Sequence, residues 1–197
     1  NTAAFVSSRN IVVANNLLPE TGWNFGTNFT HKFRFLGRDA VVNFDYYYTY
    51  FENQVVVDRE DVHEIRFYNL QGSSYAHYLQ GEVSLEPVQN FIVMLAYKHS
   101  EAFTNYSGNL RQRPFVPRDK GLVNMEYKST NKKWSINSTL KILGYSRIPS
   151  GGVVHHGYVI ADRSKPFVLI NSQLSYFLPK LDIYLGAENI GNYVQHH

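Results

Sequence analysis

The stretch DREDVHE holds the densest group of residues that could do chemistry. It places His63 among the carboxylates of Asp58, Glu60, Asp61 and Glu64. Imidazole and carboxylate groups bind transition metals, but these residues lack the fixed spacing of a metal motif. We therefore expect a solvated charged loop and no metal. The sequence also contains no G-x-S-x-G and no H-E-x-x-H, the motifs of a hydrolytic serine and of a zinc protease. This pattern predicts neither an enzyme nor a cofactor.

Two further polar stretches could bind a ligand. One carries Arg111, Arg113 and Arg118, and the other is GGVVHHGY, which contains His155, His156 and Tyr158. The forked arginine side chain suits an anionic ligand, such as a ferric chelate or a phosphorylated compound. The alternative is that the arginines form surface ion pairs with neighbouring carboxylates or with anionic lipid, and such pairs add little stability. We keep all six residues as candidates for ligand binding.

Composition limits the class of protein. Among 197 residues, 44% are hydrophobic and 15% aromatic, and none is cysteine. A folded chain is expected from these values, without disulfides or thiolate metal sites. The net charge is +3, and the basic residues are scattered, so no nucleic-acid partner is predicted. No run of about 18 apolar residues occurs, which argues against a transmembrane helix but not against membrane-crossing strands that alternate.

Alternation of apolar and polar residues runs through the whole chain, as in half-buried strands. From Trp23 to Phe35, the odd positions are mostly aromatic and the even positions are small or polar. The stretch from Val41 to Val57 continues this pattern over more residues than an ordinary strand of about 3–10. Helical periodicity is nowhere sustained. The sequence therefore predicts an all-β fold.

The predicted strands are joined by connections that alternate in length. LGRD, EPVQN, STNKK and LPK are short turns. Three long connections separate them: the one that holds the charged loop DREDVHE, residues 100–118 and residues 147–165. Short turns at one end and long loops at the other are typical of outer-membrane barrels. A soluble sandwich or lipocalin-like barrel is the alternative, although its strands are usually shorter.

A membrane sheet explains the long alternating strands, because a tilted strand needs about 9–11 residues to cross the hydrocarbon. One face would then contact lipid and the other a wet lumen. We predict that Asp45, Tyr47, Gln80 and Glu82 face the lumen. Aromatic side chains at strand ends would form the interfacial girdles; the candidates are Trp23, Trp134, Tyr46, Tyr48, Tyr50 and Tyr97.

Four phrases in the sequence resemble the C-terminal barrel half of TonB-dependent outer-membrane receptors of the Bacteroidetes type. They are LLPETGWNFG, YFENQVVVD, FYNLQGSSYAHYLQGEVSLEP and DIYLGAENIGNYVQ. The order and spacing of these phrases also agree with the family, over essentially all 197 residues.

The resemblance implies an antiparallel up-and-down transmembrane β-barrel segment, about eight strands of a barrel of roughly 22. Residues 1–21 would be an outer loop and strand lead-in, 22–190 the eight strands, and 191–197 an outer loop. The family's plug domain and its final strand are missing from this stretch.

By resemblance, the function is active import of a scarce solute across the outer membrane. The solute would be a siderophore, cobalamin, metal chelate or oligosaccharide. The expected partners are membrane lipid and lipopolysaccharide, the TonB-ExbB-ExbD motor acting through the plug, the small-molecule ligand, and a surface lipoprotein. The alternative is a self-contained eight-stranded barrel that anchors or adheres, because eight strands can close on a lumen filled with side chains.

Overall fold

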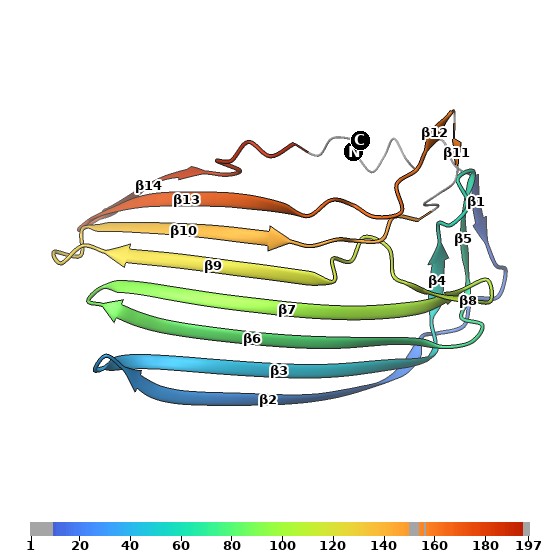
Figure 1. Ribbon diagram of the computed structural model, residues 1–197, viewed down its shortest axis with the longest axis horizontal. Helices are drawn as coiled ribbons and strands as arrows, with labels where there is room; N and C mark the ends of the chain where they lie inside the picture. Colours follow the sequence, from blue (N-terminus) through green and yellow to red (C-terminus); the bar gives the residue numbers. More distant parts are fainter. Residues whose placement is uncertain (1–9, 150–153, 156, 195–197) are drawn as a thin grey trace.

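The computed structural model describes residues 10–149, 154, 155 and 157–194. Its main element is a nine-stranded sheet in which neighbours along the path β14-β13-β10-β9-β7-β6-β3-β2 are hydrogen-bonded and antiparallel (Figure 1). The strands are β2 (Thr21–Phe35), β3 (Arg38–Asn53), β6 (Ser74–Val88), β7 (Phe91–Tyr106), β9 (Asp119–Lys128), β10 (Trp134–Leu143), β13 (Phe167–Leu178) and β14 (Leu181–Ala187). The ninth, β8 (Asn109–Gln112), pairs only with the end of β7. The all-β antiparallel prediction is confirmed. In the described ranges, no helix is long and apolar enough to span a membrane.

The connections separate the sheet into a turn end and a loop end, as the sequence predicts. The short turns lie at one end, and the long connections gather at the other (Figure 1). The β2–β3 turn has positive φ at both Leu36 (52°) and Gly37 (77°), which matches the right-handed twist of the two strands. Asn90, with φ 63°, turns the chain between β6 and β7.

The prediction of one uninterrupted strand from Val41 to Val57 is wrong. β3 ends at Asn53, and Val55–Asp58 form β4 in a separate three-stranded sheet. Where the chain leaves the large sheet, the Val55 amide donates to the Glu20 side chain (3.0 Å), and Val55 is opposite Asn69 in the small sheet.

The expected loop at 100–118 also contains regular structure. β7 continues to Tyr106, and a Ser107–Gly108 turn leads into β8. Both turn residues have positive φ, 48° and 89°, so two tight residues reverse the chain. The expected charged loop ends where β5 (Glu64–Asn69) begins.

The strand register gives the large sheet two chemically different faces. One row crosses six strands through directly opposed aliphatic residues: Val42, Val83, Leu95, Val123, Leu140 and Ile170. The next row lies on the opposite face and contains Asn43, Glu82, Ala96, Leu122, Lys141 and Leu169. We call these the apolar face and the polar face. The register places Asp45, Tyr47, Gln80 and Glu82 on the polar face.

The apolar face is uncovered. Phe25, Phe29 and Phe33 are 59%, 59% and 37% exposed, so no second layer of the described chain packs on them. A soluble sandwich would bury such a row, and a continuous exposed apolar surface marks contact with a membrane or a partner. The arrangement is that expected of a lipid-facing sheet.

Aromatic residues frame the aliphatic rows of the apolar face. At the turn end, the Trp134 and Tyr176 rings pack with centroids 4.3 Å apart. Nearer the loop end, Tyr50 is opposite both Trp23 and Tyr75. Of the predicted girdle residues, Trp134 therefore lies at the turn end and Trp23 at the loop end.

Apart from Ala40 and Ser135, the buried side chains of the described residues lie at the loop end. There the small sheet, ordered β1 (Asn10–Val13), β5, β4, crosses the ends of the long strands (Figure 1). Val56 of β4 is 2% exposed. The facing positions of β7 are buried too: Ser100, Ala102, Thr104 and Tyr106. A small core therefore fixes the long connection against the sheet.

We predict that Leu95→Arg destabilises the folded barrel in a bilayer by about 2–4 kcal/mol, the cost of an arginine at the lipid midplane. Leu95 lies in the aliphatic row, whereas its neighbour Ala96 faces the other way, opposite Glu82. Ala96→Arg is the matched control and should cost far less. Urea unfolding of the full-length protein in vesicles, followed by the gel mobility of the folded form, measures both. Equal losses from the two variants would contradict the assignment of faces.

Candidate functional site

Three of the four phrases that resemble the receptor family meet in space at the loop end: LLPETGWNFG, YFENQVVVD and FYNLQGSSYAHYLQGEVSLEP. The Asn69 side chain bonds both main-chain groups of Leu18: it accepts from the Leu18 amide (2.8 Å) and donates to the Leu18 carbonyl (3.0 Å). Asn69 also donates to Asn53 (3.1 Å), which donates to the Pro19 carbonyl (2.7 Å). These amide side chains bond main-chain groups that no neighbouring strand pairs with. Because Asn69 ends β5, the contacts hold the small sheet against the chain that leads into β2.

A second set of contacts continues this junction into the large sheet. The buried Gln54 accepts a hydrogen bond from the Ser74 hydroxyl (2.7 Å), and its carbonyl accepts one from the Leu70 amide (2.7 Å). Because Ser74 begins β6, this contact ties the start of β4 to the next long strand.

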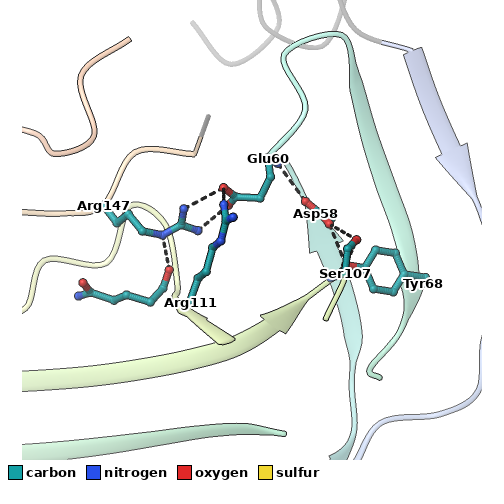
Figure 2. Close-up of polar contacts among 7 residues, drawn as sticks. Asp58, Glu60, Tyr68, Ser107, Arg111 and Arg147 are labelled. Atoms are coloured by element: carbon teal, nitrogen blue, oxygen red, sulfur yellow. Dashed lines mark hydrogen bonds and ion pairs between the residues drawn. The ribbon is translucent and has the colours of Figure 1, made fainter. Parts of the chain in front are cut away.

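Glu60 is the hub of an ionic cluster that joins all three long connections (Figure 2). Arg147 donates to it through both terminal nitrogens (3.0 and 2.5 Å), and Arg111 donates at 2.9 Å. Arg147 also donates to the Gln112 carbonyl (2.5 Å), and its guanidinium lies 5.6 Å from the Tyr106 ring centroid. The Arg147 and Glu60 side chains are only 18% and 17% exposed. A two-pronged, half-buried pair of this kind is stronger and more specific in geometry than a surface pair.

Asp58, the last residue of β4, holds the start of the segment that carries Glu60. Its carboxylate accepts hydrogen bonds from the hydroxyls of Tyr68 (2.8 Å) and Ser107 (3.2 Å) and from the Glu60 amide (2.9 Å). Figure 2 shows Tyr68 and Ser107 converging on it. Burial raises the pKa of Tyr68 above its usual value, so Tyr68 stays a neutral donor at physiological pH.

Two shallow cavities open at the loop end, and Tyr106 lines both. The first, of about 270 Å³, is mixed in charge: Asp58, Glu60, Asp61 and Glu64 line it together with two arginines, Arg66 and Arg111. The second, of about 240 Å³, has arginines and no carboxylate in its lining. They would favour ligands of different charge.

The structure separates the predicted ligand-binding residues. Arg111 lines the first cavity and Arg113 the second. Arg118 pairs with Glu101, away from both. His155 and Tyr158 are opposed in a short hairpin formed by β11 (Val154–His155) and β12 (Tyr158–Val159). His156 lies outside the described residues.

The residues predicted to face the lumen take part in cross-strand contacts on the polar face. Asp45 accepts from the Asn28 side chain (2.6 Å), and Gln80 is opposite Asp45 in the register. Glu82 accepts from Asn43 (3.4 Å). The Tyr47 ring covers Gly26, since a Cβ atom there would lie 2.5 Å from the ring.

Sequence reasoning missed a polar chain on the apolar face of β7. Asp119 accepts from the Tyr97 hydroxyl (2.6 Å) and lies 2.8 Å from His99 Nδ1. His99 Nε2 is 3.7 Å from Glu101, which pairs with Arg118. The available signal was the change from Val93 and Leu95 to His99 and Glu101 at alternate positions. On β7, this group of polar side chains marks the limit of the aliphatic surface on the side of the loop end.

No group of three or more histidine, cysteine, aspartate or glutamate side chains suited to a metal ion occurs in residues 10–149, 154, 155 and 157–194. The cluster around Glu60 is therefore held by ion pairs and hydrogen bonds. It can position loops and present charge.

We predict that Glu60→Gln loosens the long connections, because Arg147 loses its charged partner while still half-buried. Loss of a hydrogen-bonded charge costs about 1.5–3 kcal/mol. Limited proteolysis of the full-length protein should then cleave the chain within residues 54–73 several times faster than in the unchanged protein. The long strands of the large sheet should remain uncut.

Glu101→Gln is the control, because its partner Arg118 is 53% exposed and such pairs contribute about 0.2–1 kcal/mol. If both variants accelerate cleavage of residues 54–73 equally, Glu60 is not the hub of the cluster.

No protein-family profile matches the sequence, and no curated protein does. Solved structures do match. The FrpB iron transporter of Neisseria meningitidis (F5-1 variant) gives a TM-score of 0.66 at 14% identity, covering 94% of this chain and 29% of that one. A mutant (G324V) of the ferric enterobactin receptor PfeA of Pseudomonas aeruginosa gives 0.63 at 15%, covering 92% and 27%. The copper transporter OprC gives 0.63 at 13%, covering 92% and 27%.

These matches agree with the fold described above. The chain spans less than a third of the length of each of these structures, all of which are TonB-dependent outer-membrane receptors. At these identities, the likeness concerns the fold. The chain therefore has the fold of a partial barrel of the TonB-dependent outer-membrane receptors.

Proposed function

We propose that this chain forms part of an outer-membrane receptor that imports a scarce solute. The observation that carries the proposal is the pair of chemically distinct faces on a sheet with a receptor-barrel fold. β3 and β7 each have 16 residues, more than the roughly 9–11 needed to cross the hydrocarbon. The strands would therefore extend beyond the lipid and carry the loop end into the aqueous phase.

The sheet requires further pairing to be stable in lipid. All residues of β2 and β14 are exposed, and these strands lie at opposite ends of the strand order. An unpaired strand edge in hydrocarbon costs several kcal/mol for each unsatisfied backbone group. We infer that other strands of a larger barrel pair with both edges. A self-contained barrel would need β2 to pair with β14, and no such pairing occurs in the described residues.

Transport in this proposal is gating and not bond chemistry. The polar face, with Asp45, Tyr47, Gln80 and Glu82, would border a lumen and a plug domain. A TonB-ExbB-ExbD motor would move the plug after the solute binds at the loop end. The apolar face would contact lipid. The polar side chains of Tyr97, His99, Glu101 and Asp119, nearer the loop end, would contact lipopolysaccharide.

The candidate ligand-binding residues remain part of the proposal, but they differ in how readily a ligand could reach them. Arg111 and Arg118 have carboxylate partners, so a ligand would have to compete with Glu60 or Glu101. Arg113 has no ion pair within the described residues, which makes it the strongest of the three. His155, His156 and Tyr158 would contribute from the neighbouring connection, and a surface lipoprotein would dock on the same outer side.

The test is accumulation of labelled solute by cells with and without the full-length gene. Ferric chelates, a copper complex, cobalamin and an oligosaccharide form the panel. We expect at least one solute to accumulate only when both the gene and TonB are present.

Deletion of TonB is the control, since passive diffusion through an open barrel would continue without it. Equal accumulation of every solute with and without the gene would rule out an import role for this panel. Recovery of the protein from cells in detergent-free buffer would exclude the membrane location.

A further inference from the structure

The second cavity at the loop end has the chemistry of a binding site. Its lining combines the side chains of Arg113, Phe115 and Tyr106 with the valines of β4, and it contains no carboxylate. The first cavity, which also has Tyr106 in its lining, has four carboxylates. Within the same end of the sheet, the second cavity is therefore the one that favours an anion.

Phe115 has a backbone conformation that argues for a role beyond packing. Its φ is 61°, in the left-handed region that is a genuine outlier for a bulky residue. It is the one aromatic residue in the described chain with such a φ. The side chain is 56% exposed, so core packing does not compensate for this strain. Strain of this kind persists where the surroundings impose it, and it concentrates at ligand sites.

The surrounding hydrogen bonds impose this conformation. The Arg113 amide donates to the Ala102 carbonyl (2.7 Å), and the Phe115 amide donates to the Arg147 carbonyl (2.9 Å). Pro114 between them has a restricted φ and no amide hydrogen. The tripeptide is thus anchored on β7 and on the β10–β13 connection, which holds the phenyl ring at the cavity.

Arg113 supplies the charge. Its side chain is exposed, and no described carboxylate forms an ion pair with it, unlike Arg111, Arg118 and Arg147. A guanidinium without a protein partner is available to bind an anionic group through two parallel hydrogen bonds.

We propose that Arg113 and Phe115 form a subsite for a flat ring that carries an anionic group, a carboxylate or a phosphate. The ring stacks on Phe115, and the anion binds Arg113. A cavity of about 240 Å³ is smaller than the sites of drug-sized ligands, about 300–1,000 Å³, so it takes one ring of a larger solute. The binding of such a ring follows from the cavity itself. Only the further statement that this ligand is the imported solute rests on the proposed function.

The test uses the full-length receptor in detergent micelles and phenyl phosphate as the probe. Saturation-transfer NMR should detect phenyl phosphate binding, and benzyl alcohol, which lacks the anion, should bind much more weakly. Inorganic phosphate, which lacks the ring and has no carbon-bound protons to observe, is tested by competition and should displace phenyl phosphate only at much higher concentration. Arg113→Gln should weaken phenyl phosphate binding about tenfold or more, the effect of losing one charge-assisted contact.

Phe115→Gly separates binding from folding. Glycine adopts a positive φ without strain, so this variant should unfold at the same or higher urea concentration and yet lose phenyl phosphate binding. Arg66→Gln, in the first cavity, is the matched control: Arg66 pairs with Glu64 and is not a ligand-binding candidate, so this variant should leave binding unchanged.

Three results would overturn the subsite: no phenyl phosphate binding at millimolar concentration, equal losses from Arg113→Gln and Arg66→Gln, or full binding by Phe115→Gly. None of them bears on gene-dependent uptake, so failure of the subsite and failure of the transport proposal are distinguishable.

Discussion

The register of the long strands is the constraint on which the rest of the structure depends. Because side chains alternate with period two, a slip of one residue on any strand would exchange its two faces. The observed register aligns aliphatic residues from Val42 on β3 to Ile170 on β13 in one uninterrupted row. It also keeps Asp45 opposite Gln80 on the other face. A sheet with two such faces can separate an apolar phase from an aqueous one only while every strand keeps its place.

The loop end is built on a different principle from the strands. Few large apolar side chains are buried there; the buried set includes Gln54, Asp58 and Ser74. Side-chain amides and carboxylates bond to main-chain groups that have no strand partner. Asn69, which bonds both main-chain groups of Leu18, is the clearest case. Polar groups buried in this way specify one geometry, because leaving any of them unpaired is costly.

This difference explains which sequence-based predictions held. Alternation and turn residues are local signals, and they located the long strands and the turn end well, including the turn at Leu36–Gly37. The ligand-binding set was chosen from residue type alone. The sequence could not indicate that Arg118 lies apart from Arg113, or that Arg147, which it did not single out, is the main partner of Glu60. Such pairs join residues up to 87 positions apart, and no local pattern encodes them.

The sequence by itself determined the class of fold, the alternation of the two faces and the order of short and long connections. These features depend on the preferences of each residue and its near neighbours for a pleated, half-apolar surface. Only the tertiary structure decided where β3 ends, because Val55 continues the apolar pattern while its amide bonds to Glu20, and the preceding Gln54 bonds to Leu70 and Ser74. It alone decided the charge of the two cavities too, because their lining residues come from two connections that lie apart in the sequence and that the pairing of the long strands brings together.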